Sequence, residues 1–163
     1  EMSIEYLKLQ IDYGVDYVKI FESWAGLLEA KEYYKFIIEP NKEISESIRK
    51  YSRKTKIIHF PRGSKSEYMN FIQDVYCDVI AIDNDFPEKL INVAKEKKIT
   101  IQGNLNPIDL VRGGQNLENK TKEILKKFKE NNHIFNLSHG VLPETPIDNV
   151  HKVKTIIDKN EIT

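Results

Sequence analysis

The chain has 163 residues, which is enough for one hydrophobic core and short for two. Its formal net charge is +0, so charge favours neither a nucleic-acid partner nor a membrane surface. The single cysteine, Cys77, excludes an internal disulfide and fits a reducing compartment. No apolar run approaches the roughly 18 residues of a membrane span, and the polar start has no signal-peptide pattern. We therefore expect one domain over residues 1–163 of a cytoplasmic protein.

Five short apolar runs are expected to form β-strands. They are rich in Val, Ile and Phe and stay apolar at successive positions, as is typical of strands covered on both faces. The runs are Tyr17 to Phe21, Lys56 to Phe60, Val79 to Asp83, Thr100 to Gly103 and Ile134 to Leu137.

Amphipathic, charge-rich stretches alternate with these strands and are expected to form helices. They are Ile4 to Tyr13, Tyr33 to Tyr51, Ser66 to Tyr76, Glu88 to Lys97, Leu117 to Glu130 and Asp148 to Lys159. Gly113-Gly114 is expected to be a local turn inside a connection. Strand-helix alternation predicts an α/β fold with a parallel sheet. A closed eight-unit barrel needs about 250 residues, so five units predict a small open sheet or a truncated barrel.

Polar and glycine residues follow every expected strand. In parallel α/β folds these strand ends hold the ligand-binding groups, so we expect a functional face there. Three residues on it have open roles. Ser23 is either a helix N-cap or a ligand contact. His139 either donates a proton or binds an anion, or else satisfies a backbone carbonyl. Asp83 either caps the next helix or meets a substrate.

Several kinds of site have no support in the sequence. Neither a G-x-G-x-x-G after the first strand nor a phosphate-binding P-loop motif is present. H-E-x-x-H and G-x-S-x-G are also missing, and the four histidines are not spaced with cysteine as zinc ligands. Cys77 precedes a strand and is expected to be a buried thiol, so we expect no metal site.

Four motifs in order give this chain a resemblance to the uroporphyrinogen decarboxylase family. They are F-E-S-W-A-G from Phe21 to Gly26, H-F-x-R-G from His59 to Gly63, Q-G-N-L-x-P from Gln102 to Pro107, and N-L-x-H-G-V-L-P-E-T-P from Asn136 to Pro146. The resemblance runs from about Tyr6 to Ile157. It implies a (β/α)8 TIM-barrel fold, of which this chain supplies about five parallel units, the fourth to the eighth.

The resemblance also implies an activity and site residues. Members remove the four acetate carboxyl groups of uroporphyrinogen III to give coproporphyrinogen III in heme biosynthesis, without a metal or organic cofactor. By resemblance, Ser23 hydrogen-bonds a substrate carboxylate and Phe21 lines the apolar wall against the macrocycle. His139 is the catalytic candidate, since it contacts a carboxylate or pyrrole edge and assists proton transfer. A tetrapyrrole substrate and, in the full-length parent, a homodimer are expected.

Other parts of the family's site have no counterpart in this chain. An aspartate that supports the pyrrole cation, a substrate-binding tyrosine and an arginine-rich loop belong upstream of the matched units. We therefore expect this chain to be inactive by itself. Smaller departures occur within the motifs, where Asn84 replaces a usual tryptophan, Asn106 a usual aspartate and Ser138 a usual glycine.

Two alternatives remain open. The chain is either part of the enzyme or a non-catalytic fragment that binds tetrapyrrole or pairs with an N-terminal half. A weaker alternative is a corrinoid-linked methyltransferase of the same fold, which activates a thiol on zinc. That reaction needs several thiolate ligands, whereas this chain has one cysteine.

Overall fold

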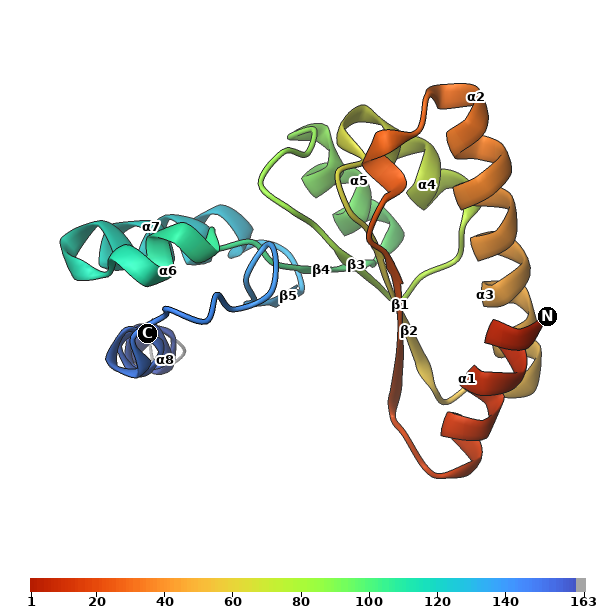
Figure 1. The fold of residues 1–163 in the computed structure, drawn as a ribbon, viewed down its shortest axis with the longest axis horizontal. Helices are drawn as coiled ribbons and strands as arrows, with labels where there is room; N and C mark the ends of the chain where they lie inside the picture. Colours follow the sequence, from red (N-terminus) through yellow and green to blue (C-terminus); the bar gives the residue numbers. More distant parts are fainter. Residues whose placement is uncertain (161–163) are drawn as a thin grey trace.

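The computed structural model describes residues 1–160, which contain one parallel five-stranded sheet (Figure 1). Its strands are β1 (Tyr17–Glu22), β2 (Lys56–Pro61), β3 (Val79–Ala81), β4 (Thr100–Gln102) and β5 (His133–Ile134). They are hydrogen-bonded in the order β1-β2-β3-β4-β5, and every pair is parallel. This sequential order is that of a barrel, because a doubly wound sheet reverses order part-way. The prediction of a partial (β/α)8 barrel is therefore confirmed.

Helices connect all the strands. They are α1 (Met2–Asp12), α2 (Ala30–Tyr33), α3 (Glu39–Tyr51), α4 (Tyr68–Asp74), α5 (Lys89–Lys97), α6 (Pro107–Arg112), α7 (Gly114–Phe128) and α8 (Ile147–Asn160). A π-helical turn, η2 (Tyr34–Ile38), joins α2 to α3, and short 3-10 turns, η1 (Ala25–Leu27) and η3 (Lys65–Glu67), follow β1 and β2. Within residues 1–160, no helix combines the length and the apolar character needed to cross a lipid bilayer.

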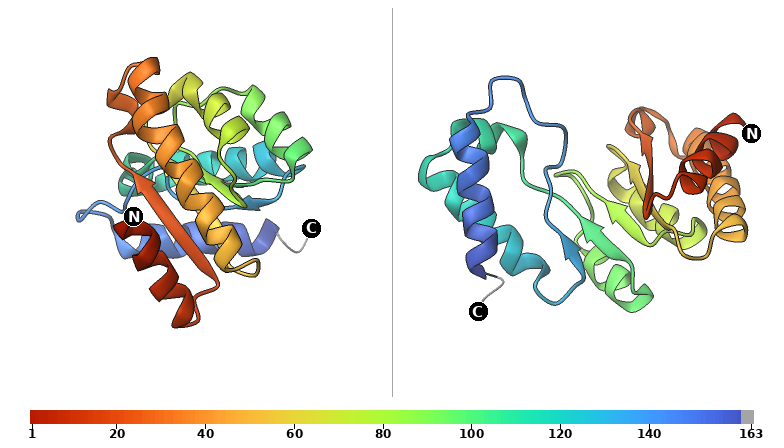
Figure 2. Two further views of the ribbon diagram at one scale, coloured as in Figure 1. Left: turned by 90° about the vertical axis from the view of Figure 1, so that its right-hand side faces the viewer. Right: turned by 90° about the horizontal axis from the view of Figure 1, so that it is seen from below.

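The two faces of the sheet differ in what covers them. Figure 1 shows α1, α3 and α4 together on one side of β1 and β2, and Figure 2 shows α6 to α8 at the far end of the sheet. The main core joins strand residues such as Ile80 and Ile101 to helix residues such as Phe71 and Leu90. A separate apolar cluster contains strand residues alone, namely Ile58, Phe60, Val79 and Ala81. These alternate along the strands with the helix-covered positions, so they mark the inner face of the barrel.

The π-helical turn lies directly before Pro40. The sequence predicts one helix from Tyr33 to Tyr51, and the structure extends it at the N-terminus and interrupts its hydrogen-bond pattern at residues 34–38. Proline has no backbone N–H and its ring crowds the preceding turn, which an ordinary α-helix accommodates poorly. The wider turn keeps the chain helical, so that Ile37 and Ile38 still reach the core.

Several elements differ from the prediction, most clearly β3, β5 and α6. β3 ends at Ala81 instead of Asp83, because Asp83 turns away from the ladder into a loop. β5 covers His133–Ile134, and only a single bridge between Leu105 and Leu137 extends the pairing beyond it. The short helix α6 was not expected. Asn106 caps it through Oδ1, which accepts from the amide of Ile108 at 2.9 Å.

Gly113 separates α6 from α7 with a φ of +66°, where the sequence predicts only a turn. A Cβ here would lie 2.6 Å from the side chain of Asn149 on α8. That Asn149 donates to the carbonyls of Leu110 and Val111 at 2.7 and 3.2 Å. Glycine is therefore required both for the backbone angle and for the approach of α8, which satisfies the last carbonyls of α6.

His59 is fully buried on the helix-covered side of β2. Its Nε2 lies 2.8 Å from the hydroxyl of Ser45 on α3, and its ring meets Phe71 edge-on. Burial lowers the pKa of His59 to about 3. The histidine of the second motif is thus a neutral core residue that joins β2 to α3.

The pH dependence of stability follows from this burial. The unfolded chain binds a proton on His59 below about pH 6.5, and the folded chain does so only near pH 3. The contribution of His59 is therefore complete above pH 6.5 and is lost as the pH falls from 6.5 towards 3. We expect the free energy of unfolding in urea to decrease by up to about 1.4 kcal/mol per pH unit in this range from His59 alone.

His59→Gln provides the comparison, because glutamine does not titrate. His133 and His139 are present in both proteins, so the difference between the two stability curves isolates His59. The curve of the variant is expected to be flatter between pH 6.5 and 4.5. Parallel curves for the two proteins would contradict the buried neutral histidine.

Candidate functional site

The loops that follow the five strands form one edge of the sheet, which we call the carboxyl rim (residues 22–27, 61–65, 82–86, 103–106 and 136–141). Because all strands are parallel, their carboxyl ends meet at this edge. Hydrogen bonds join each loop to its neighbour. The amide of Gly26 donates to the carbonyl of Arg62 at 2.9 Å, and the amide of Ser138 donates to the carbonyl of Leu105 at the same distance.

Asp83 is the central member of these connections. Its carboxylate accepts from the amide of Gly63 at 2.5 Å and from the amide of Asp85 at 3.1 Å. Its carbonyl accepts from the side-chain amide of Asn104 at 2.9 Å. Asp83 is buried, and it caps no helix. It fixes the loop after β2 against the loops after β3 and β4.

Asn84 continues the chain of bonds to the last loop. Its Nδ2 donates to the carbonyl of Asn104 at 3.0 Å, and its Oδ1 accepts from the hydroxyl of Ser138 at 2.7 Å. Ser138 is completely buried and directly precedes His139. Asn84 and Ser138, two positions where the resemblance implied other residues, therefore contact each other, and together they hold the backbone that carries His139.

His139 is half-buried in a cavity of about 260 Å³ at the rim. Its Nδ1 is buried and has no hydrogen-bond partner among residues 1–160, so the possible role of satisfying a backbone carbonyl through this atom is not realised. Burial lowers the pKa of His139, and the positive charge of Arg62 lowers it further against the opposing effect of Asp83. A neutral imidazole is therefore favoured, and a bound carboxylate would raise the pKa again.

Phe21 lines the same cavity as His139 and comes from β1 at the other end of the sheet. Its ring is 60% exposed and meets Phe60 edge-on, with the ring centroids 6.2 Å apart. The ammonium of Lys19 lies 4.7 Å from the centre of the Phe21 ring. The structure thus brings two of the three predicted site residues to one hollow with an aromatic wall.

Ser23 lies on the same rim, in a neighbouring cavity of about 230 Å³. That cavity is also lined by Trp24, Arg62 and Lys65. The residue before η1 is Trp24 and no side chain caps this turn, so Ser23 is not the helix cap that one reading of the sequence allowed. Two cations and a hydroxyl in one exposed hollow form a surface suited to a carboxylate.

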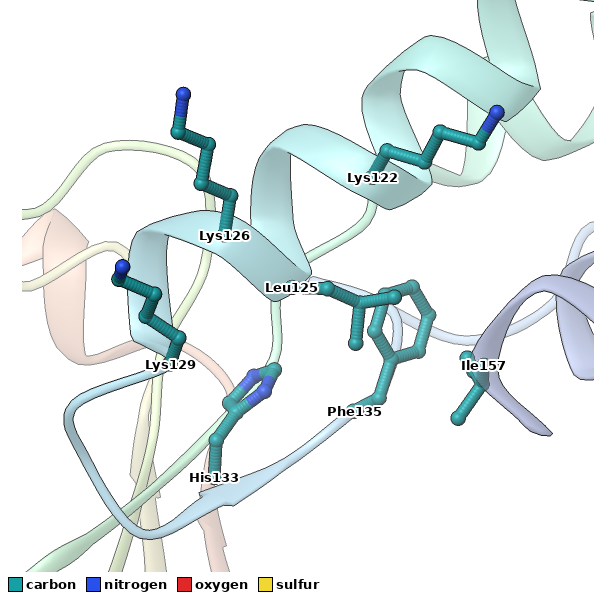
Figure 3. A pocket seen from close by; sticks show the side chains of 7 residues that line it. All are labelled: Lys122, Leu125, Lys126, Lys129, His133, Phe135 and Ile157. Carbon is teal, nitrogen blue, oxygen red and sulfur yellow. The ribbon is translucent and has the colours of Figure 1, made fainter. Parts of the chain in front are cut away.

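A cavity of about 640 Å³ lies away from the rim between α7, β5 and α8. Figure 3 shows Lys122 and Lys126 on α7, and Lys129 directly after it, with their ammonium groups directed away from Phe135. The imidazole Nε2 of His133 is already 2.6 Å from the carbonyl of Gly103, and its ring stacks on Phe128. The cavity lies away from the carboxyl rim, and we assign it no role in the site.

The methyltransferase alternative finds no support in the site. Cys77 lies before β3, at the amino end of the sheet, and burial raises the pKa of its thiol to about 12. A thiol with this pKa stays protonated at neutral pH and is a poor zinc ligand. Among residues 1–160, no three His, Cys, Asp or Glu side chains converge as metal ligands.

Comparison with known proteins places this rim in a family. The sequence model of uroporphyrinogen decarboxylase (URO-D) matches residues 1–159. The chain belongs to the uroporphyrinogen decarboxylase family. The uroporphyrinogen decarboxylases of Rickettsia bellii and Rickettsia rickettsii are 43% and 41% identical to it over 150 residues, or 92% of this chain. The Rhodobacter capsulatus protein is 37% identical over 158 residues, or 96% of the chain.

The chain spans less than half the length of these relatives. The match covers 44% of the Rickettsia bellii decarboxylase and 46% of the Rhodobacter capsulatus decarboxylase. Together with the five-stranded sheet, this agrees with a part of the family barrel.

Sequence reasoning overlooked three side chains at or near the rim, namely Arg62 in the rim itself and Lys19 and Gln102 within β1 and β4. Lys19 gave a usable signal, since it is a charged residue at an alternating position inside an otherwise apolar strand. Arg62 and Gln102 belong to the second and third motifs, but the sequence predicted no role for either side chain. Their contacts across the sheet depend on neighbours up to 83 residues away, which no local pattern reports.

The close approach of Gly26 and Gly63 yields a test of the rim. A Cβ on Gly26 would lie 2.3 Å from the carbonyl oxygen of Gly63, which is backbone and cannot rotate away. We expect Gly26→Ala to lower the free energy of unfolding by about 1–3 kcal/mol, measured by urea denaturation. Gly140→Ala is the matched control, because open space surrounds that position and little change is expected. Equal stabilities of the two variants would contradict the described contact.

Proposed function

We propose that this chain forms the C-terminal part of a uroporphyrinogen decarboxylase, which converts uroporphyrinogen III to coproporphyrinogen III. The observation that supports this most is the rim cavity, where Phe21 and His139 line one hollow from the first and last strands. Ser23, Arg62 and Lys65 add a polar, cationic hollow beside it. An apolar wall next to cationic and hydroxyl groups suits a macrocycle of pyrrole rings that carries acidic side chains.

Decarboxylation requires the stabilisation of a positive charge on a pyrrole ring. Protonation of a ring carbon gives a cation, the bond from the acetate methylene to its carboxylate breaks, and CO2 leaves. The bond electrons flow into the cationic ring and leave an exocyclic methylene. A proton added at that exocyclic carbon gives the methyl group, and loss of the first proton from the ring carbon restores the neutral pyrrole. The site must hold the acetate and favour the cation over the neutral ring.

Each predicted residue has a role consistent with its position. The Phe21 ring would lie against the macrocycle. The Ser23 hydroxyl would donate to a side-chain carboxylate in the cationic hollow. His139 would contact a carboxylate or pyrrole edge and assist proton transfer, because its unpaired Nδ1 and lowered pKa leave the imidazole uncommitted.

The proposed activity needs groups that this chain does not supply. By resemblance, the cation-stabilising aspartate belongs to an earlier strand of the barrel. The homodimer of the full-length parent and a cytoplasmic location are likewise proposals that rest on the resemblance. A non-catalytic fragment that binds tetrapyrrole stays the alternative, and activity measurements distinguish the two.

The first test compares the chain alone with a completed barrel. The chain is co-expressed with the part of the Rickettsia bellii decarboxylase that it does not match. We expect no decarboxylation of uroporphyrinogen by the chain alone and measurable coproporphyrinogen formation by the pair, followed by chromatography of the oxidised porphyrins. Robust turnover by the chain alone would refute this division of the site, and an inactive pair that binds porphyrin would favour the non-catalytic alternative.

The second test uses His139 in the completed barrel. We expect His139→Asn to reduce the decarboxylation rate by about 10²-fold, the effect of losing one transition-state hydrogen bond. His151→Asn is the matched control, because His151 is exposed on α8 and far along the chain from the rim. Equal rates for both variants and the parent would exclude His139 from the reaction.

A further inference from the structure

Lys19 is a cation on the inner face of the barrel. It lies in the middle of β1, two residues before Phe21, so both side chains point to the same face. Its ammonium is 2.6 Å from Oε1 of Gln102 on β4, and lies 4.7 and 5.6 Å from the ring centres of Phe21 and Phe60. The side chain therefore reaches across the face from the first strand to the fourth.

No negative charge balances this ammonium within residues 1–160. Its hydrogen-bond acceptor is a neutral amide, and none of the described ion pairs includes it. Its other close neighbours are two aromatic rings. Partial burial lowers the pKa of Lys19, which reflects the cost of removing the charge from water. Such a cation is stabilised when an anion occupies the space beside it.

The space beside Lys19 is the rim cavity that also holds His139. Lys19, Phe21, Phe60 and Gln102 line one part of it, and Ser138 and His139 line another. Across the cavity, the His139 imidazole favours its neutral form and supplies no counter-charge. The unbalanced positive charge of Lys19 therefore lies at the wall of this cavity.

We propose that Lys19 binds a carboxylate of the ligand on the inner face, opposite His139 and against the wall formed by Phe21 and Phe60. This rests on the proposed function in taking the ligand to be a macrocyclic polycarboxylate. Gln102 acts as a positioning residue, because its amide oxygen holds the ammonium over the cavity. One acidic group of the ligand is thus fixed at the first strand, while the ring lies against the aromatic wall.

Binding can be followed without catalysis. The chain has one tryptophan, Trp24, which lies on the rim, so quenching of its fluorescence by a porphyrin reports binding. Uroporphyrin, with eight carboxylates, is titrated into the completed barrel, and a cationic porphyrin of similar size is the ligand control. We expect Lys19→Gln to weaken uroporphyrin binding about tenfold or more, the effect of losing one charge-assisted hydrogen bond. Lys19→Arg should retain most of the affinity.

Lys54→Gln is the matched control for charge, since Lys54 is exposed before β2, at the opposite end of the sheet. It should bind uroporphyrin as the parent does. Circular dichroism verifies that each variant is folded. Equal affinity of the parent, Lys19→Gln and Lys54→Gln would overturn the proposal.

A second measurement identifies the anion. Lysines are acetylated with and without uroporphyrin, and mass spectrometry gives the extent at each position. Protection of Lys19 by uroporphyrin, and not by the cationic porphyrin, supports the proposal. Protection by the completing half alone, with no further change when uroporphyrin is added, would overturn it.

The proposed function and the Lys19 site fail in different ways. If the completed barrel binds uroporphyrin through Lys19 but does not decarboxylate it, the proposed function is refuted and the Lys19 site is retained. If the Lys19→Gln variant decarboxylates at the normal rate, and uroporphyrin does not change the acetylation of Lys19 in the parent, the Lys19 site is refuted and the proposed function is retained.

Discussion

The hydrogen bonds centred on Asp83 are the constraint on which the arrangement of the rim depends. Parallel strands end in separate loops, and each loop has backbone groups without a ladder partner. The carboxylate of Asp83 accepts from the backbone amide of Gly63, and its backbone carbonyl accepts from the side-chain amide of Asn104. Hydrogen bonds to one residue therefore hold three loops together. Because Asp83 and Asn104 are buried, leaving one of their polar groups unpaired would cost about 1–3 kcal/mol, which keeps the loops in one arrangement.

The same connections explain how residues far apart in sequence come to share one cavity. Asn84 binds Ser138, and Ser138 fixes the backbone of the next residue, His139. On the inner face, Lys19 spans from β1 to β4 and leans on the ring of Phe21. The first strand and the last loop are therefore positioned by polar contacts over a strand-only apolar cluster, with no helix between them.

Sequence patterns predicted those features of the fold that depend on residues close together in the chain. Apolar runs predicted the strands, since these depend on neighbouring residues, whereas the barrel followed from the resemblance of four motifs to a known family. The short helix α6 was missed although its start has a local signal, the cap at Asn106, and its end depends on a distant contact between Gly113 and α8. The roles of Asp83 and Lys19 were missed because they depend on distant contacts alone. Their partners lie 20 and 83 residues away, and only the folded sheet brings them together.

The inner face also shows why a partial barrel is chemically unfinished. In a closed barrel the interior is packed, whereas here Tyr17 and Phe21 remain more than half exposed on β1. β1 and β5 have one paired neighbour each, so two edges of the sheet keep free backbone groups. Added strands would satisfy those edges and at the same time enclose Lys19 and His139. Exclusion of water strengthens the attraction between a cation and a carboxylate, so closing the fold and strengthening the site are one physical step.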